Sequence, residues 1–283
     1  ISRHLKLRRH RNLISKKSYT APFAIWVIAG TVIPILTIAY YGITNRNGAF
    51  TLENITAMFN PQHLEALGLS LLLSLVSTIV CLILAFPMAL ILRGSRFGKQ
   101  GFMIFVFILP MWMNFLLRTM AWQVLLERQG VINSLLASIG LPRQEMMGTP
   151  GAVVLGMVYD FLPFMVLPIY NVVSKIDNRL IEAAYDLGAG KFYVFRKIIF
   201  PLSIPGIASG VTMVFIPALT TFVISNMLGG GKVNLIGNII EQEFTVNSNW
   251  YLGSGLSLIM MVFIIVSMLA VQKFSDEEGG NMI

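Results

Sequence analysis

Two ionisable residues, Arg118 and Asp160, lie inside long apolar stretches of the chain. A charge inside a membrane costs roughly 2.5–3.5 kcal/mol on insertion scales, so each of these residues needs a partner or a function. Two chemistries suit the pair. The side chains could form an ion pair that joins their helices, or Asp160 could be an anion that meets a passing polycation.

Aromatic and acidic residues add further candidates for binding a cation. Trp112, Trp122 and Tyr159 lie close in sequence to the two charged residues, and aromatic faces attract cations within about 6 Å of the ring centre. Trp122 also suits an interfacial anchor. Two glutamates in a later polar stretch could attract a cationic substrate or bind a docking partner, and a solvated loop face explains them equally well. The candidate substrate path therefore consists of Trp112, Tyr159, Asp160, Glu241 and Glu243.

The sequence lacks the patterns that carry enzymatic or metal chemistry. The nearest match to the phosphate-binding pattern G-x-x-x-x-G-K-[ST] ends at Lys191, but Tyr185 replaces its first glycine and Phe192 replaces the Ser/Thr. HExxH, Cys-x-x-Cys and GxSxG patterns are absent, and Cys81 is the single cysteine. We therefore predict that the chain is not an enzyme and itself binds no metal or cofactor. Any energy source must be another polypeptide.

The composition indicates which elements position these residues. Hydrophobic residues make up 55% of the chain and charged residues 12%, whereas soluble domains carry about 25% charged residues. A helix needs about 20 apolar residues to cross a bilayer core. We predict an all-α integral membrane protein with about six transmembrane helices, at residues 21–43, 68–92, 101–126, 151–173, 204–227 and 252–272.

The basic residues predict the orientation. Sixteen Lys/Arg fall in the N-terminal arm, the second and fourth connections and the tail, against four in the other connections. This bias places both termini in the cytoplasm, and it explains the net charge of +8 without nucleic-acid binding. The chain then divides into a basic arm (1–20), a transmembrane permease domain (21–272) and a cytoplasmic tail (273–283). Arg118 and Asp160 would lie equally deep, about 12 Å below the outer boundary, and this equality favours the ion pair.

The cytoplasmic stretch 175–201 reads KIDNRLIEAAYDLGAGKFYVFRKIIFP and predicts two short helices. The first can begin at Asp177 or Asn178, which are good N-caps, and can end at Gly188, because glycine accepts the left-handed conformation that closes a helix. The second runs from about Lys191 until Pro201 ends it. An amphipathic helix on such a loop needs a partner for its apolar face.

This loop resembles the EAA motif of ABC importer permeases, whose pattern is Glu-Ala-Ala, three residues, Gly, nine residues, Ile, any residue, Leu, Pro. The chain has Glu182, Ala183, Ala184, Gly188, Ile198 and Pro201 at the matching positions, with Phe200 where leucine is usual. Stretches 111–126, 159–170 and 227–240 extend the resemblance to the B-type permease subunit of spermidine/putrescine importers. The similarity covers most of the chain, from about residue 51 to the sixth span.

The resemblance implies a type I ABC importer permease (MetI-like) architecture in a bacterial plasma membrane. It implies that the loop forms a coupling helix seated in a cytoplasmic ATPase, through Glu182, Ala183, Ala184, Leu187, Gly188 and Pro201. It implies as partners a second permease subunit, two copies of the ATPase, which would bind ATP and Mg²⁺, an extracellular substrate-binding protein, and membrane lipid.

Other functions remain open at this point. The same permease role could serve another substrate, such as a metal chelate or an organophosphonate, since related permeases share the loop whatever they carry. An intramembrane enzyme would need a reactive dyad, for which Arg118 and Asp160 are a poor set. A structural membrane scaffold would not need the spaced loop motif.

Overall fold

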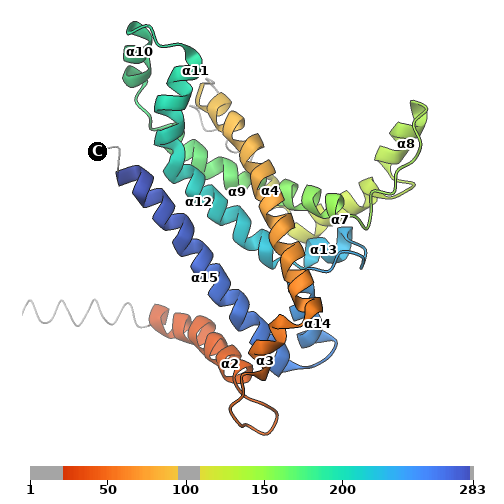
Figure 1. Cartoon of the computed structure of the whole chain (residues 1–283). Coiled ribbons are helices and arrows are strands. Elements are labelled where there is room, and N and C mark those ends of the chain that lie inside the picture. The colour runs from red at the N-terminus through yellow and green to blue at the C-terminus, as the bar shows by residue number, and fades with distance from the viewer. Residues whose placement is uncertain (1–21, 95–108, 281–283) are drawn as a thin grey trace, which may run out of the picture.

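The computed structural model describes residues 22–94 and 109–280, and this part of the chain is predominantly helical (Figure 1). It contains five helices that are long and apolar enough to cross a membrane: Pro22–Gly42, Pro61–Gly94, Pro150–Val173, Lys191–Thr220 and Trp250–Lys273. The all-α membrane architecture is thus confirmed, together with five of the six expected spans.

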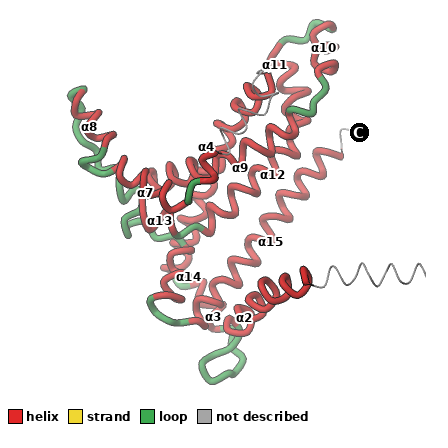
Figure 2. Tube along the Cα trace, turned by 180° about the vertical axis from the view of Figure 1, so that it is seen from behind, coloured by secondary structure: helices red, strands yellow, loops and turns green. Residues whose placement is uncertain are grey.

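The secondary-structure elements that the structure describes are all helical. In chain order they are η1 (Ile28–Val32), α2 (Ile33–Gly42), α3 (Glu53–Thr56), η2 (Ala57–Phe59), α4 (Pro61–Gly94), η3 (Leu109–Trp112), α7 (Phe115–Leu126), α8 (Val131–Ser138), α9 (Pro150–Val173), α10 (Asn178–Asp186), α11 (Lys191–Val194), η4 (Phe195–Ile199), α12 (Phe200–Thr220), α13 (Val223–Leu228), α14 (Ile236–Thr245) and α15 (Trp250–Gly280). Helices α10 and α11 lie at one end of the molecule, and α3 and α14 lie at the other (Figures 1 and 2).

Helices α4, α9 and α12 pack against one another and form the main core. The crossing of α9 and α12 depends on two glycines at positions i and i+4, the small-residue spacing that lets membrane helices approach closely. A Cβ on Gly206 would lie 2.9 Å from the Pro168 carbonyl oxygen, and one on Gly210 would lie 2.7 Å from the Met165 sulfur. The two backbones can therefore meet only where side chains are absent.

A second apolar cluster lies at the end of the molecule that carries α14. Met58, Leu219, Ile236, Leu256 and Met260 form it, and they come from η2, α12, α14 and α15. Helix α15 packs against α12 on one side and against α2 on the other. This cluster holds α14 between the ends of α12 and α15.

The expected third span, 101–126, is not one continuous helix in the part that the structure describes. Its first eight residues lie outside the described residues. The remainder is the short turn η3 followed by α7, with a break between them. Asn114 adopts ψ 130° and its side chain accepts a 2.8 Å hydrogen bond from the Leu116 N–H, which begins a new helix. The side chain of Asn114 thus satisfies a backbone N–H that has no partner at the start of a helix, and this N-cap stabilises the break between η3 and α7.

The expected fifth span, 204–227, is corrected at both ends. It begins at Lys191 and ends at Thr220, because Thr221 is extended at ψ 134° and α13 then begins afresh. The break is stabilised by Asn238, whose side-chain nitrogen donates to the Phe222 carbonyl at 3.2 Å and to Asn226 Oδ1 at 2.6 Å. Such tertiary bonds replace those that an unbroken helix would form.

The basic arm 1–20 lies outside the described residues. Helix α15 continues to Gly280 and so enters the stretch 273–283 expected as a tail. The cytoplasmic placement of both termini stays a prediction.

Candidate functional site

Helix α10 carries the EAA residues and has well-defined ends, as expected from the sequence. Asp177 Oδ1 accepts a hydrogen bond of 2.9 Å from the Arg179 N–H at its start. At its end Gly188 adopts φ +83°, its N–H donates to the Tyr185 carbonyl, and the Ala189 N–H donates to the Ala184 carbonyl. This pair of bonds is the Schellman closure, in which a left-handed glycine satisfies the last carbonyls. The expected limits of the first loop helix are confirmed.

Helix α10 presents its side chains to the outside and buries none of them fully. Leu187 is 90% exposed and Leu180 is 53% exposed, although both are apolar. Glu182 and Ala183 are also exposed, and Ala184 is half-buried. The helix projects from the end of the bundle (Figure 1). An exposed helix with apolar side chains on its surface is suited to a groove on a partner, where an amphipathic helix docks through its apolar residues.

A basic residue on another span holds the start of this loop. Arg93, in the last turn of α4, donates from Nη2 to the Ile176 carbonyl at 3.0 Å and to Asn178 Oδ1 at 2.8 Å. From the sequence, Arg93 served only as one of the basic residues that predict the membrane orientation. Nothing local distinguished it from other basic loop residues, because its two acceptors lie more than 80 positions away.

The second half of the loop continues directly into a membrane span, and the expectation that Pro201 ends the second helix is wrong. Lys191–Thr220 is one helical rod that contains a π-helical segment, Phe195–Ile199, before Pro201. The Phe200 N–H bonds the Phe195 carbonyl, five residues back. Pro201 follows this segment inside the rod, where it has no N–H to give to the helical ladder but does not end the helix.

Aromatic rings fix this junction to α4. The ring of Phe86 lies 5.7 Å from that of Phe195 and 6.0 Å from that of Phe200, measured between centroids. The loop is thus attached to α4 at two places, through the Arg93 hydrogen bonds and through these rings, while α12 forms its direct continuation. A displacement of α10 and α11 would therefore be transmitted to both α4 and α12.

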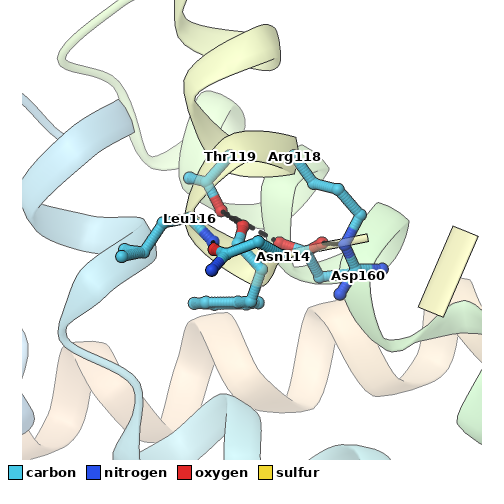
Figure 3. Close-up of polar contacts among 6 residues, drawn as sticks. Asn114, Leu116, Arg118, Thr119 and Asp160 are labelled. Carbon is cyan, nitrogen blue, oxygen red and sulfur yellow. Dashed lines mark hydrogen bonds and ion pairs between the residues drawn. The ribbon is translucent and has the colours of Figure 1, made fainter. Parts of the chain in front are cut away.

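Arg118 and Asp160 come together between α7 and α9 (Figure 3). Arg118 Nε lies 3.4 Å from Asp160 Oδ1, with side chains 7% and 1% exposed. Thr119 donates from Oγ1 to Asp160 Oδ2 at 3.2 Å. The equal depth expected from the sequence agrees with this contact, and the burial of the carboxylate favours the structural ion pair over contact with a passing substrate in this conformation.

The ion pair leaves hydrogen-bonding capacity unused. Arg118 Nε and Nη1 and Asp160 Oδ1 are buried without a hydrogen-bond partner among the described residues. A buried pair of this kind contributes little net stability, but removal of one partner leaves an uncompensated charge. The ion pair thus connects α7 to α9, and each of its two charges needs the other to stay buried without a large cost.

Of the three aromatic candidates, Trp122 and Tyr159 contact each other, whereas Trp112 is exposed. Trp122 and Tyr159 form an edge-to-face pair, with centroids 5.4 Å apart and planes at 71°. This pairing strengthens the contact of α7 with α9 next to the ion pair. Trp112 lies in η3 and its side chain is 75% exposed.

The two glutamates of α14 line different cavities. Glu241 lines an open cavity of about 530 Å³ between the end of α12, α14 and α15. Glu243 lines a polar cavity of about 510 Å³ between α14 and the start of α4, together with Lys232 and His63. Residues two apart on a helix point in nearly opposite directions. The prediction that Glu241 and Glu243 belong to one substrate path therefore joined two side chains that lie in different cavities.

Comparison with known proteins gives concordant results. Residues 69–276 match the family described as binding-protein-dependent transport system inner membrane component. The chain is 37% identical over 253 residues to the spermidine/putrescine transport system permease protein PotB of Haemophilus influenzae, covering 85% of this chain and 88% of that relative. The PotB protein of Escherichia coli is 35% identical, over 88% of this chain and 94% of its own length. A solved bacterial ABC transporter that imports the acidic polysaccharide alginate has the same fold, with a TM-score of 0.79 at 17% identity, covering 95% of this chain and 99% of that one.

Proposed function

This chain belongs to the binding-protein-dependent transport system inner membrane component family, and on that premise we propose that it forms half of the translocation path of an ATP-driven polyamine importer. The observation that carries the transport role is the exposed helix α10 at the end of a rod that runs unbroken from Lys191 to Thr220. The polyamine substrate class is supported by the relatives, which are spermidine/putrescine permeases at 35–37% identity over most of the chain.

The partners follow from what the chain lacks and from what it exposes. A cytoplasmic ATPase would receive α10 through Glu182, Ala183, Ala184 and Leu187, and it would bind the ATP and Mg²⁺ for which this chain has no motif. A second, non-identical permease subunit would complete the path, two ATPase copies would serve the two permeases, and a substrate-binding protein would dock on the opposite, outer side.

The proposed coupling is mechanical. When the ATPase closes on nucleotide it displaces α10, and the displacement crosses the short turn at 187–190 to α11, which continues through η4 into α12 without a further loop. Arg93 and Phe86 make α4 move with it. Helix α9 follows because Gly206 and Gly210 bring its backbone against α12. The core helices thus change their tilt together and alternate the side to which the path opens.

Uptake of labelled polyamines tests this function. The chain, its partner permease, the ATPase and the binding protein are expressed in a bacterium that lacks every other polyamine importer. We expect ATP-dependent accumulation of labelled spermidine or putrescine, displaced by excess unlabelled polyamine and not by an organophosphonate or a metal chelate. No accumulation with all four subunits present would refute the substrate class.

A further inference from the structure

The cavity beside Glu241 has the size and the lining of a small-ligand site. Its volume of about 530 Å³ lies within the usual range for ligand pockets, roughly 300–1,000 Å³. Apolar side chains form most of its wall, and the polar groups are those of Thr220, Glu241, Thr245 and Ser257. A largely apolar pocket with a few polar groups is typical of sites that bind one end of a ligand by charge and the remainder by contact.

Glu241 is the charged residue that lines this cavity. Its side chain is half-buried, and Oε1 accepts a hydrogen bond of 2.9 Å from Thr245 Oγ1. No described lysine, arginine or histidine lies within 4.0 Å of its carboxylate. A cation that enters the cavity could therefore pair with this carboxylate and form a charge-assisted hydrogen bond.

The wall of the cavity suits an aliphatic cation. Phe222 is 37% exposed and lines the cavity together with Phe244. Phe244 is seated closely over α15, since a Cβ on Gly253 would lie 3.0 Å from its ring, and its centroid is 5.5 Å from that of Trp250. Aromatic faces attract an ammonium group, while Met260 and Ile264 offer apolar contact to methylene groups.

A second cavity lies farther along the same two helices. It has a volume of about 320 Å³ and is lined by Pro205, Ser209 and Thr212 of α12 and by Met268 and Gln272 of α15. Helices α12 and α15 pack against each other, and both views show them side by side (Figures 1 and 2). The Glu241 cavity involves the last residue of α12 and earlier residues of α15, so the two cavities follow the α12–α15 seam toward the end that carries α10.

We propose that Glu241 binds an ammonium group of the polyamine, with the methylene chain against Phe222, Phe244 and Met260, as the first station of a path along the α12–α15 seam. This proposal rests on the proposed function and places the substrate on this chain. Glu243 is not part of this station. It lines the other cavity, where Lys232 is also present, and it accepts a hydrogen bond of 2.8 Å from Asn247.

The experiment compares Glu241→Gln with Glu243→Gln, which remove the same charge from the same helix. The complete importer is reconstituted in proteoliposomes, and the initial rate of labelled spermidine uptake is measured against concentration. We expect the KM to rise about tenfold for Glu241→Gln, as loss of one hydrogen bond to a charged group implies, and to stay within about twofold for Glu243→Gln. Glu241→Asp should recover part of the loss because it restores the charge.

A labelling measurement covers the case in which Glu241→Gln fails to assemble. Because Cys81 is buried, a cationic methanethiosulfonate reagent would react chiefly with an introduced thiol. Spermidine should slow the labelling of the Ser257→Cys variant, whose residue lines the Glu241 cavity, and leave that of the Gln242→Cys variant unchanged, since Gln242 lines the other cavity.

Two results overturn the proposal while leaving the proposed function intact. One is wild-type uptake of polyamine with an unchanged KM for Glu241→Gln, as expected if lipid or a partner helix fills the cavity. The other is an equal rise of the KM for both glutamine variants, as expected from a general field effect. Failure of the wild-type importer to take up any polyamine would instead refute the proposed function, and the station with it.

Discussion

The guanidinium of Arg93, in the last turn of α4, donates a hydrogen bond of 2.8 Å to the side chain of Asn178, the first residue of α10. The same nitrogen, Nη2, also donates to the Ile176 carbonyl at 3.0 Å. The helix that we expect to meet the ATPase is therefore fastened to a span that is far from it in sequence. Motion of this helix has two routes into the bundle, one along the chain into α12 and one across these bonds into α4.

Arg93→Gln should weaken the second route without removing the docking surface. Hydrogen bonds to charged groups contribute about 1.5–3 kcal/mol when buried, and partial exposure of Arg93 lowers this figure. We expect transport per ATP hydrolysed to fall about three- to tenfold while the ATPase still co-purifies with the permease. Lys191→Gln, which removes a charge from the same loop, is the matched control and should leave the ratio unchanged. Loss of ATPase association in Arg93→Gln would contradict this assignment.

Gly188 and Gly190 provide a matched pair for the geometry of the loop. Gly188 adopts φ +83° and Gly190 adopts φ −73°, and a Cβ on either would meet open space. Gly188→Ala should therefore cost about 1–2 kcal/mol of backbone strain and redirect the end of α10, whereas Gly190→Ala should be tolerated. Affinity for the ATPase, measured with the purified permease pair, should fall about tenfold for the first and stay unchanged for the second. Equal affinities would show that the left-handed turn does not position the helix.

Asp160→Asn tests whether the buried ion pair is structural. Removing one partner of a buried pair costs about 3–5 kcal/mol, because the remaining charge is uncompensated. We expect a clear fall in the melting temperature of the detergent-purified complex. The double variant Arg118→Met with Asp160→Leu should recover most of this stability, since neither charge then remains.

The same double variant separates the two chemistries considered for Asp160. With a purely structural pair, a stable double variant takes up polyamine at close to the wild-type rate. If Asp160 contacts substrate during transport, the double variant folds but its uptake is lost. The second result would contradict the structural assignment and restore the interpretation of Asp160 as an anion on the path.

Gly206→Ala should separate α9 from α12. Its Cβ would lie 2.9 Å from the Pro168 carbonyl oxygen, which belongs to backbone and cannot move aside cheaply. Overpacking of this kind costs about 1–3 kcal/mol. We expect a lower melting temperature and lower yield in the membrane. Gly68→Ala in α4, where a Cβ meets nothing within 4 Å, is the control. An equally stable Gly206→Ala variant would mean that the crossing adapts.

Features that depend on neighbouring residues could be predicted from the sequence. The N-cap at Asp177, the left-handed turn at Gly188 and most span positions follow from local chemistry and hydropathy. The equal depth of Arg118 and Asp160 followed from counting residues along two successive spans, because the rise of a helix is constant.

Features that depend on distant partners could not be predicted in this way. The break at Thr221 requires Asn238 from α14, and the role of Arg93 requires acceptors in another loop. Pro201 was misread because a π-helical segment precedes it, and such segments have no reliable local pattern. Glu241 and Glu243 could be separated only once α14 was seen to lie between two cavities.

The most direct test of the account is the accessibility of position 187. Leu187→Cys places a thiol where the side chain is 90% exposed, while Cys81 stays buried. A membrane-impermeant maleimide should label this variant in inside-out vesicles and not in right-side-out vesicles, and the purified ATPase should block the labelling. Labelling from the outer side, or labelling that the ATPase leaves unchanged, would contradict the coupling of this helix to an ATPase inside the cell.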